Sequence, residues 1–200
     1  MTLLPPTGYD PNSPAPFFGV AVRLGVGGRA VAAARKILVM GNLIAAAITR
    51  ASITGSDGGT YTFPDVAAGT AALATPVAVA SADEADVLFG AGSECALMCR
   101  AIFAQRASAD ITVCPVAVGV SGTPAKATAT LLFATAAGTA GAVKLVISGQ
   151  QVPDVAVASG QTAANIAADV AIAINRMSNL PVVATVSSAT VTVQAKISGE

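Results

Sequence analysis

Two apolar runs of strand length enclose two helical patterns, and this order constrains the fold of the 200-residue chain more than any other feature. The first run, residues 36–40, is continuously apolar after its lysine, which is typical of a strand buried on both faces. Helical patterns follow over residues 81–89 and 93–105, and residues 110–118 return as a strand. Strand, helices and strand in this order predict an α/β layer in which the helices pack on a sheet.

The starts of both helices are marked by capping residues. Ser81 and Glu84 form a capping box, and Ser93 precedes the second helix after a glycine-rich turn. The second helix has an apolar stripe at helical spacing, which consists of Cys95, Cys99, Ile102 and Phe103. We also expect a strand over residues 76–80 and short strands around residues 61–63.

A proline-rich segment precedes this layer. Residues 1–16 hold five prolines among glycine and polar residues, a composition that favours an extended arm. Residues 17–24 then alternate in the period of a strand and end at a run of glycines. A lone strand behind an arm needs a sheet to join, either in its own domain or at the edge of another subunit's sheet. The residues expected to form this linking strand are Phe17, Phe18, Val20, Val22 and Leu24.

The composition changes near residues 119–124 to alternating threonine and alanine, which indicates a second unit. An amphipathic helix is expected over residues 162–176, capped by Ser159 or Thr162. Several strands are expected around it, over residues 127–133, 143–148, 152–157, 182–186 and 190–197, the last two as a hairpin. Within the last strand, Val191 and Ile197 are expected on one face and Lys196 on the other.

The predicted fold class is therefore α/β plus α+β, with three parts. Residues 1–33 form an extended N-terminal arm with its strand. Residues 34–120 form an α/β layer, and residues 121–200 form a β-rich domain with one helix packed on its sheet.

Charge and histidine content exclude several classes of function. Eleven basic and eleven acidic residues give a formal net charge of +0, so we expect no nucleic-acid partner. The chain has no histidine, which removes the commonest general base and catalytic metal ligand. We expect neither enzyme activity nor a cofactor.

The apolar composition points to association between copies. Residues 66–82 and 127–143 are free of charge, but glycine, threonine and proline interrupt them, so no membrane span is expected. A mean hydropathy of +0.69 without such a span is explained if neighbouring subunits cover much of the surface. The start of the chain lacks the features of a secretory signal, and we expect intracellular synthesis.

Two short motifs have a ligand-binding and a structural interpretation. Residues 25–30 fit the dinucleotide pattern G-x-G-x-x-G/A, but they lack the following acid and the space for a crossover helix. We interpret them as a flexible joint. Residues 90–93 open a helix with free N–H groups that suit a phosphate, yet Glu94 follows directly, and a glycine turn with a serine cap is favoured.

Cysteines and acids near the helices have the same two interpretations. Cys95, Cys99 and Cys114 offer three thiolates to zinc, but no fourth ligand is apparent, and we expect reduced core residues and no metal. Asp83, Glu84 and Asp86 are interpreted as acids at a helix start, not as an acid/base pair.

In combination, these segments resemble a known family. The strand at residues 19–20, the runs at 36–41 and 81–93, the following helix and the strand at 111–118 look like the N-terminal part of a Mu-type contractile phage tail sheath protein. Residues 127–197 are similar to the β-rich inserted domain that such sheaths carry. The likeness covers most of residues 17–200.

The resemblance implies a structural role in a virion, with synthesis in the host cytoplasm. Sheath subunits build a helical tube of stacked rings around an inner tail tube, and the sheath shortens to drive that tube into a cell. Expected partners are other copies of the chain, the tail tube protein, and baseplate and tail terminator proteins. Residues 17–24 match the position of the strand that links sheath neighbours. The family is much longer, so we expect an N-terminal portion or a shortened relative.

Two other classes of function are weighed against this one. An adhesin-like module from a phage or pilus would use the threonine-rich strands of residues 125–197 to bind a surface polysaccharide, although the chain has few aromatic residues to stack on sugars. An enzyme with its site at Gly25 or Cys95 would have to work without histidine.

Overall fold

The computed structural model describes residues 36–106, 109–117 and 125–198. All of them belong to one unit of the chain, residues 35–200. Helices and strands are mixed in it, which confirms the predicted combination of α and β structure.

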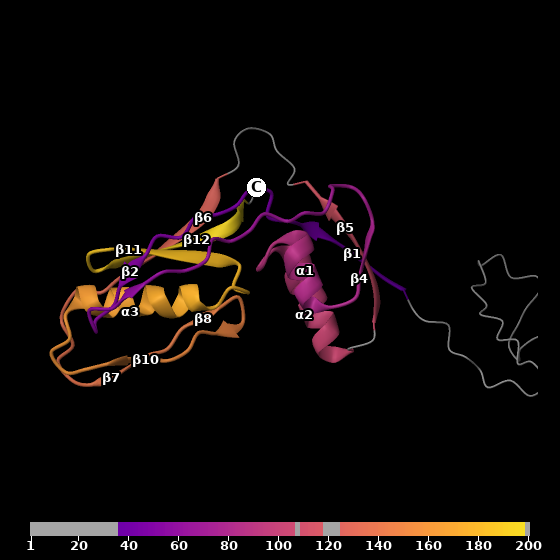
Figure 1. The fold of residues 1–200 in the computed structure, drawn as a ribbon. Helices are drawn as coiled ribbons and strands as arrows, with labels where there is room; N and C mark the ends of the chain where they lie inside the picture. Colours follow the sequence, from indigo (N-terminus) through magenta and orange to yellow (C-terminus); the bar gives the residue numbers. More distant parts are fainter. Residues whose placement is uncertain (1–35, 107–108, 118–124, 199–200) are drawn as a thin grey trace, which may run out of the picture. The chain divides into compact units, whose positions relative to one another are not determined.

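The expected strand–helix–helix–strand order is confirmed. β1 (Lys36–Asn42) pairs in parallel with β5 (Asp110–Val116), and β4 (Val77–Val79) pairs antiparallel with β5, giving the order β1-β5-β4. Helices α1 (Ala82–Phe89) and α2 (Glu94–Gln105) connect β4 to β5 and lie beside this sheet (Figure 1). The parallel pair is β1 and β5, and residues 43–109 between them, which include both helices, provide the long crossover that a parallel pair requires.

Both helices begin as their sequence predicts. Ser81 Oγ accepts a hydrogen bond from Glu84 N at 3.1 Å, and Ser93 Oγ accepts one from Ala96 N, also at 3.1 Å. Glu84 reaches back one residue further than in a standard capping box, since its Oε2 accepts from Ala80 N at 2.7 Å. The cap at Ser93 is fully buried, whereas Ser81 is exposed.

One face of the β1-β5-β4 sheet forms a core with the two helices. A methyl group added at Gly41 would lie 2.6 Å from Met98 of α2, so the helix approaches β1 closely there. Of the predicted apolar stripe, Cys95 and Cys99 are fully buried in this core, and Ile102 and Phe103 pack against it partly buried. The buried residues of the core are Val39, Leu43, Val79, Ala85, Phe89, Cys95, Cys99, Ile111 and Val113.

The opposite face of β1 contradicts the expectation of a strand buried on both faces. Leu38 is 63% exposed and Met40 is 58% exposed. The prediction was wrong because α1 and α2 pack on one face of the sheet, leaving these alternate side chains in solvent within the described residues.

A second sheet lies against the third helix. β11 (Val182–Ser187), β12 (Thr190–Ser198) and β6 (Lys126–Leu132) pair antiparallel in the order β11-β12-β6. The predicted hairpin is confirmed, and its turn holds Ser188 at a φ of 52°. Helix α3 (Ala163–Arg176) begins at the cap Thr162, one of the two predicted caps, and packs on β11 and β12.

The segment between β6 and α3 differs from its prediction. Instead of two strands over residues 143–148 and 152–157, it forms four short ones. The first predicted strand is divided between two ladders, the second is shortened to residues 155–157, and a further strand forms at residues 150–151. β7 (Gly141–Val143) pairs with β10 (Val155–Val157), and β8 (Val146–Ile147) pairs with β9 (Gln150–Gln151). Ser148 and Gly149, both at positive φ, form the turn between β8 and β9.

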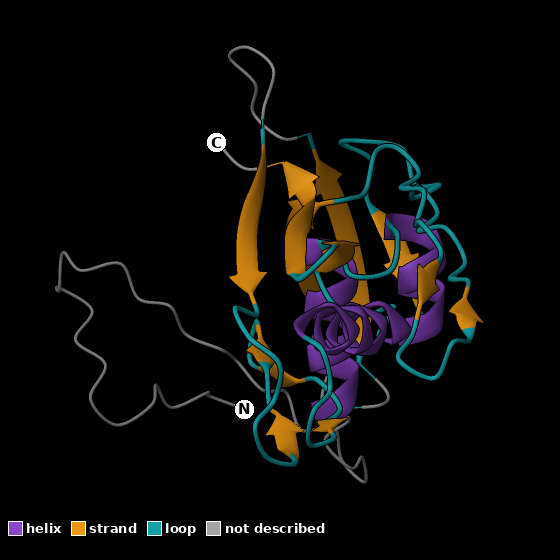
Figure 2. Cartoon of the chain, turned by 90° about the vertical axis from the view of Figure 1, so that its left-hand side faces the viewer, coloured by secondary structure: helices purple, strands orange, loops and turns teal. Residues whose placement is uncertain are grey.

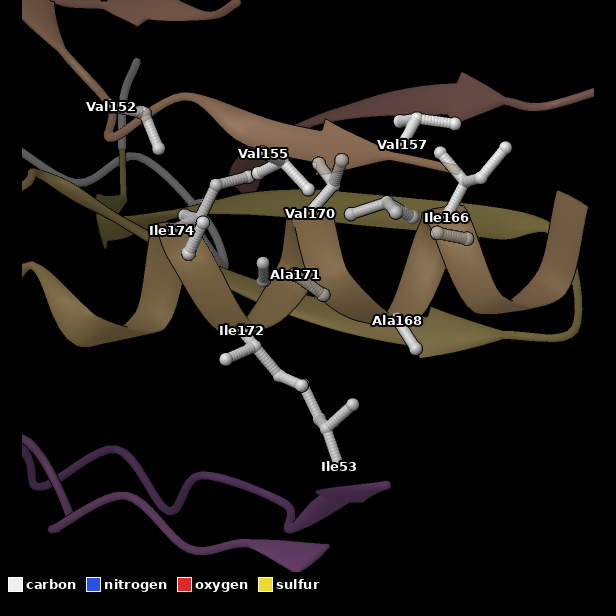
Figure 3. Packing of buried hydrophobic residues seen from close by; sticks show 14 of the residues in the cluster. Ile53, Val152, Val155, Val157, Ile166, Ala168, Val170, Ala171, Ile172 and Ile174 are labelled. Atoms are coloured by element: carbon white, nitrogen blue, oxygen red, sulfur yellow. The ribbon is translucent and has the colours of Figure 1, made fainter. Parts of the chain in front are cut away.

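Helix α3 is surrounded by strands on several sides, as Figure 2 shows with the helix nearly end-on. Val155 and Val157 of β10 cover one side, where Ile166 and Val170 meet them (Figure 3). On another side Ile172 meets Ile53 of β2 (Ile53–Thr54), which pairs with β3 (Thr60–Tyr61). The core around α3 therefore includes residues from both halves of the sequence.

Candidate assembly surfaces

The first candidate surface is the open face of the β1-β5-β4 sheet. The parallel register places Leu38 beside Thr112 and Met40 beside Cys114. Both β1 side chains are exposed apolar groups on one face of one strand, and among the described strands β1 also lies at the edge of its sheet. Exposed apolar patches beside a free strand edge are typical of surfaces that bind another polypeptide.

The second candidate surface is the edge strand β6 with the groove beside it. Most side chains of β6 are exposed, and β12 is its sole sheet neighbour in the described structure. A groove of about 480 Å³ runs along it on the side where α3 packs, bounded across the gap by β8. Its lining carries no charged side chain and consists of residues 127–131 and 145–148 together with Val182, Val193 and Ala195.

A polar cavity of about 310 Å³ lies beside α3 and contains an aspartate–tyrosine pair. Tyr61 donates its hydroxyl hydrogen to Asp57 Oδ2 at 2.6 Å, and Gly59 N donates to Oδ1 at 2.9 Å. The hydrogen bond from Tyr61 lowers the pKa of Asp57 and raises the pKa of the tyrosine. The guanidinium of Arg176 lies 5.0 Å from the centre of the Tyr61 ring.

The same cavity holds an aspartate that connects two elements. Asp169 of α3 accepts hydrogen bonds from Ser56 N at 2.9 Å and from Gln161 Nε2 at 2.8 Å. These contacts fix the turn between β2 and β3 against the helix. Asp57, Tyr61 and Asp169 thus all have hydrogen-bond partners, which is an arrangement suited to holding the fold.

Lys196 is the charged residue whose position the sequence pattern missed. It is 2% exposed, and its Nζ donates to Ala91 O at 2.8 Å and to Ser178 O at 2.6 Å. The register of β12 against β6 shifts between Gln194 and Ser198, so simple alternation does not hold at this lysine. Burial lowers its pKa to about 8, an effect that nearby Arg50 increases and Asp86 opposes.

Cys95 and Cys99 occupy core positions of the kind that small apolar residues fill. Cys95 and Cys99 are fully buried, and burial raises their pKa values to about 12 and about 11. Cys114 is partly exposed on β5 and, like the other two, is a free thiol. Among the described residues no group of three or more cysteine, aspartate or glutamate side chains is arranged to hold a metal ion.

Residues 90–93 before α2 form a glycine turn followed by a serine cap. Gly90 and Gly92 both have positive φ, and a Cβ at Gly92 would collide with the backbone of Leu180 and with Lys196 Nζ. The space above this turn is therefore filled by protein.

The acids near this turn act in the helices. Asp86 pairs with Arg100 of α2, and Glu84 caps α1. Asp83 and Glu84 lie in the first turn of α1, as predicted, whereas Asp86 lies beyond that turn and pairs with the second helix instead of acting at a helix start.

Two sets of predicted residues lie outside the described part of the chain. One is the linking strand, which consists of Phe17, Phe18, Val20, Val22 and Leu24. The other is the glycine joint at residues 25–30.

Two features of the candidate surfaces were missed by the sequence analysis. A continuous apolar run gave no sign that Leu38 and Met40 are exposed, because the same pattern suits a strand covered on both faces. The groove arises where β8 stands away from β6, and the mixed threonine and alanine sequence of β6 carries no signal for such a gap.

In the part of the chain that the structure describes, each helix is too short or too polar to cross a membrane.

The chain is similar in sequence to a known protein. No protein-family model matches the sequence. The chain is 35% identical over 135 residues to the Mu-like prophage FluMu tail sheath protein of Haemophilus influenzae. The aligned residues make up 68% of this chain and 27% of that protein, so the chain spans about a quarter of the relative's length.

Proposed function

This chain is a homologue of Mu-type tail sheath proteins, and from that relationship we propose that it is a structural subunit of a contractile phage tail sheath. Copies of it polymerise into a helical tube around the inner tail tube, and contraction of the tube drives the tail tube through the host envelope. Its partners are other copies, the tail tube protein, and baseplate and tail terminator proteins. The homology to a sheath protein is the observation that carries this proposal.

The surface of the molecule supports a role in assembly. Leu38 and Met40 on β1, Val146 on β8 and Leu132 on β6 are exposed by 58% to 71%. Only 11% of the residues of the chain are charged, so little charge needs to be desolvated when copies pack together. In the described part of the chain, an open sheet face and the edge strands β1 and β6 provide sites for apolar packing and for backbone pairing.

The division of labour follows the three predicted parts. Residues 17–24 add a strand to a sheet of a neighbouring copy and keep copies tethered. Residues 34–120 supply the α/β part of the sheath core, and residues 121–200 form the β-rich domain.

Contraction needs no catalytic residue in the subunit. A lattice can hold free energy from assembly in one packing and release it when subunits move to another, provided that they stay connected. A tether through backbone hydrogen bonds suits this purpose, because these bonds are independent of which side-chain contacts are exchanged.

Electron microscopy of the purified full chain tests the proposal. We expect tubes of regular diameter that form above a threshold protein concentration. Discrete monomers at every concentration, particularly monomers that bind to a glycan array, would contradict the sheath role and favour a surface-binding module.

A further inference from the structure

We propose that the buried amine of Lys196 is a latch, a contact that holds the core around α2 and the core around α3 together so that they open as one unit. Without it, the core around α2 opens on its own. The inference concerns a single chain and does not depend on the sheath role. Three observations on the described residues carry it: the cores are separate, the junction between them is small, and the lysine binds a turn on each side of that junction.

The two cores are built from different elements. The core around α2 takes its buried residues from β1, β4, β5, α1 and α2, together with Leu43 after β1. The core around α3 takes them mainly from α3, β10, β11 and β12. Among the residues that the structure describes, no buried residue belongs to both cores. Each core can therefore lose its packing while the other keeps it, which is the condition for local opening.

A small apolar cluster joins the two cores. Its buried members are Ile44 and Val66 from the chain between β1 and β4, and Val183 from β11; Ile48 and Ile197 pack against them partly buried. This cluster is much smaller than either core, so it supplies only a small share of the stabilisation from apolar burial. Polar contacts at the junction therefore have a large share in joining the cores.

The amine of Lys196 spans this junction. Its Nζ donates to Ala91 O at 2.8 Å, in the turn that precedes α2, and to Ser178 O at 2.6 Å, just after α3. The residue itself lies in β12 and is 2% exposed. A Cβ at Gly92 would collide with Leu180 O and lie 2.7 Å from the lysine Nζ. The turn before α2 and the chain after α3 thus approach each other as closely as a glycine allows.

The surroundings of the amine allow this contact to open. Among the described residues, Nζ donates to the two carbonyl groups and to no carboxylate. Asp86, whose charge opposes the lowering of the Lys196 pKa by burial, is paired with Arg100, and Arg50 adds a second positive charge nearby. Burial of an amine without a carboxylate costs free energy that its hydrogen bonds must offset. If the turn at Ala91 moves away, water can hydrate the amine, so solvent favours the open form.

Hydrogen exchange of the full chain, kept below the concentration at which copies associate, tests the proposal over a series of low urea concentrations. In the wild type, the slowest amides of α2 and α3 should show the same dependence on urea, because both exchange through one opening. Lys196→Met removes both hydrogen bonds and keeps the approximate length of the side chain. In this variant the amides of α2 should exchange about tenfold faster relative to those of α3, because the smaller core opens on its own.

Lys144→Met is the matched control. It makes the same substitution at a lysine whose side chain is 70% exposed. The ratio of the exchange rates of the two helices should stay at its wild-type value.

Acylation of the lysine amines in the wild-type chain gives a second measurement. Lys196 should react at least about a hundredfold more slowly than Lys144, since a reagent reaches it only when the chain opens. As urea is raised, its rate of reaction should increase in step with the exchange of both helices.

Three results would overturn the inference. They are a ratio of α2 to α3 exchange that Lys196→Met leaves unchanged, a wild-type chain in which the two helices already differ in urea dependence, and reaction of Lys196 as fast as that of Lys144. If Lys196→Met does not fold, the acylation of the wild type decides. Reaction of Lys196 before either helix opens would contradict the latch, and reaction in step with both would support it.

Discussion

Buried polar side chains at the junctions of elements hold the described fold together. Asn175 of α3 is 3% exposed; its Nδ2 donates to Ala184 O at 2.7 Å and its Oδ1 accepts from Ala184 N at 2.9 Å. The side chain thus satisfies both backbone groups of one residue in β11. The Nζ of Lys196 likewise donates to carbonyl groups in two separate turns, those of Ala91 and Ser178. Removing such a side chain leaves buried groups without partners.

Asn175→Ala should therefore lower the free energy of unfolding by about 2–3 kcal/mol, because it leaves the buried N–H and C=O groups of Ala184 without hydrogen-bond partners. Asn165→Ala, at an exposed position of the same helix, should change it by less than about 0.5 kcal/mol. Urea unfolding of both variants measures the difference. Equal effects would show that the buried amide contributes no more than the exposed one.

The buried lysine predicts a dependence of stability on pH. The pKa of Lys196 is lowered from 10.5 to about 8 in the folded chain. Between these values the unfolded chain holds a proton that the folded chain has released, so stability rises with pH in this window. A neutral amine still has two N–H groups for Ala91 O and Ser178 O.

From about pH 7.5 to pH 9.5, the wild-type chain should gain about 1–2 kcal/mol of unfolding free energy relative to Lys196→Met. The comparison with the variant is needed because Cys95 and Cys99, whose pKa values are raised, oppose the gain in both chains as pH rises above about 9. Urea unfolding at several pH values provides the measurement. Parallel pH profiles of the two chains would show that Lys196 does not titrate in this window.

At the scale of elements, the helix starts could be predicted from short local motifs. The caps at Ser81, Ser93 and Thr162 fixed the starts of all three described helices, because a cap depends on residues within one turn. The division of the strand predicted over residues 143–148 and the extra strand at residues 150–151 were not predictable, since the partner ladder decides where a strand breaks.

The candidate surfaces could not be predicted from local sequence patterns, because they depend on how distant elements pack. An apolar run such as residues 37–40 has the same pattern whether one or both sheet faces are covered. The exposure of Leu38 and Met40 could therefore be seen only once the packing of α1 and α2 was known. The burial of Lys196 follows from a register shift in β12, which no residue type announces. The linking strand stays a prediction, since residues 17–24 lie outside the described residues.

Threonine substitutions on the two faces of β1 should have different effects on stability and association. Leu38→Thr combined with Met40→Thr removes apolar surface from the open face, so it should change the unfolding free energy by less than about 0.5 kcal/mol while weakening association. Val39→Thr on the covered face buries an unpaired hydroxyl and should cost about 1–2 kcal/mol. Urea unfolding and static light scattering distinguish these effects. A double variant that is as unstable as Val39→Thr, or that associates like the wild type, would contradict the assignment of this face to assembly.

At the scale of the whole molecule, stability and assembly are expected to reside in different parts. The cores around α2 and α3 are formed, among the described residues, by residues 39–113 and 53–191, which follow the first 35 residues of the chain. The proposed tether lies within those first 35 residues. Folding and polymerisation should therefore be separable by a truncation.

Electron microscopy and sedimentation of the full chain and of a chain lacking residues 1–24 form the most direct test that copies are joined through the linking strand. Above the threshold concentration the full chain should build tubes and the truncated chain should sediment as a monomer. Below that concentration the two chains should unfold in urea at the same midpoint. Tubes built by the truncated chain would contradict the account.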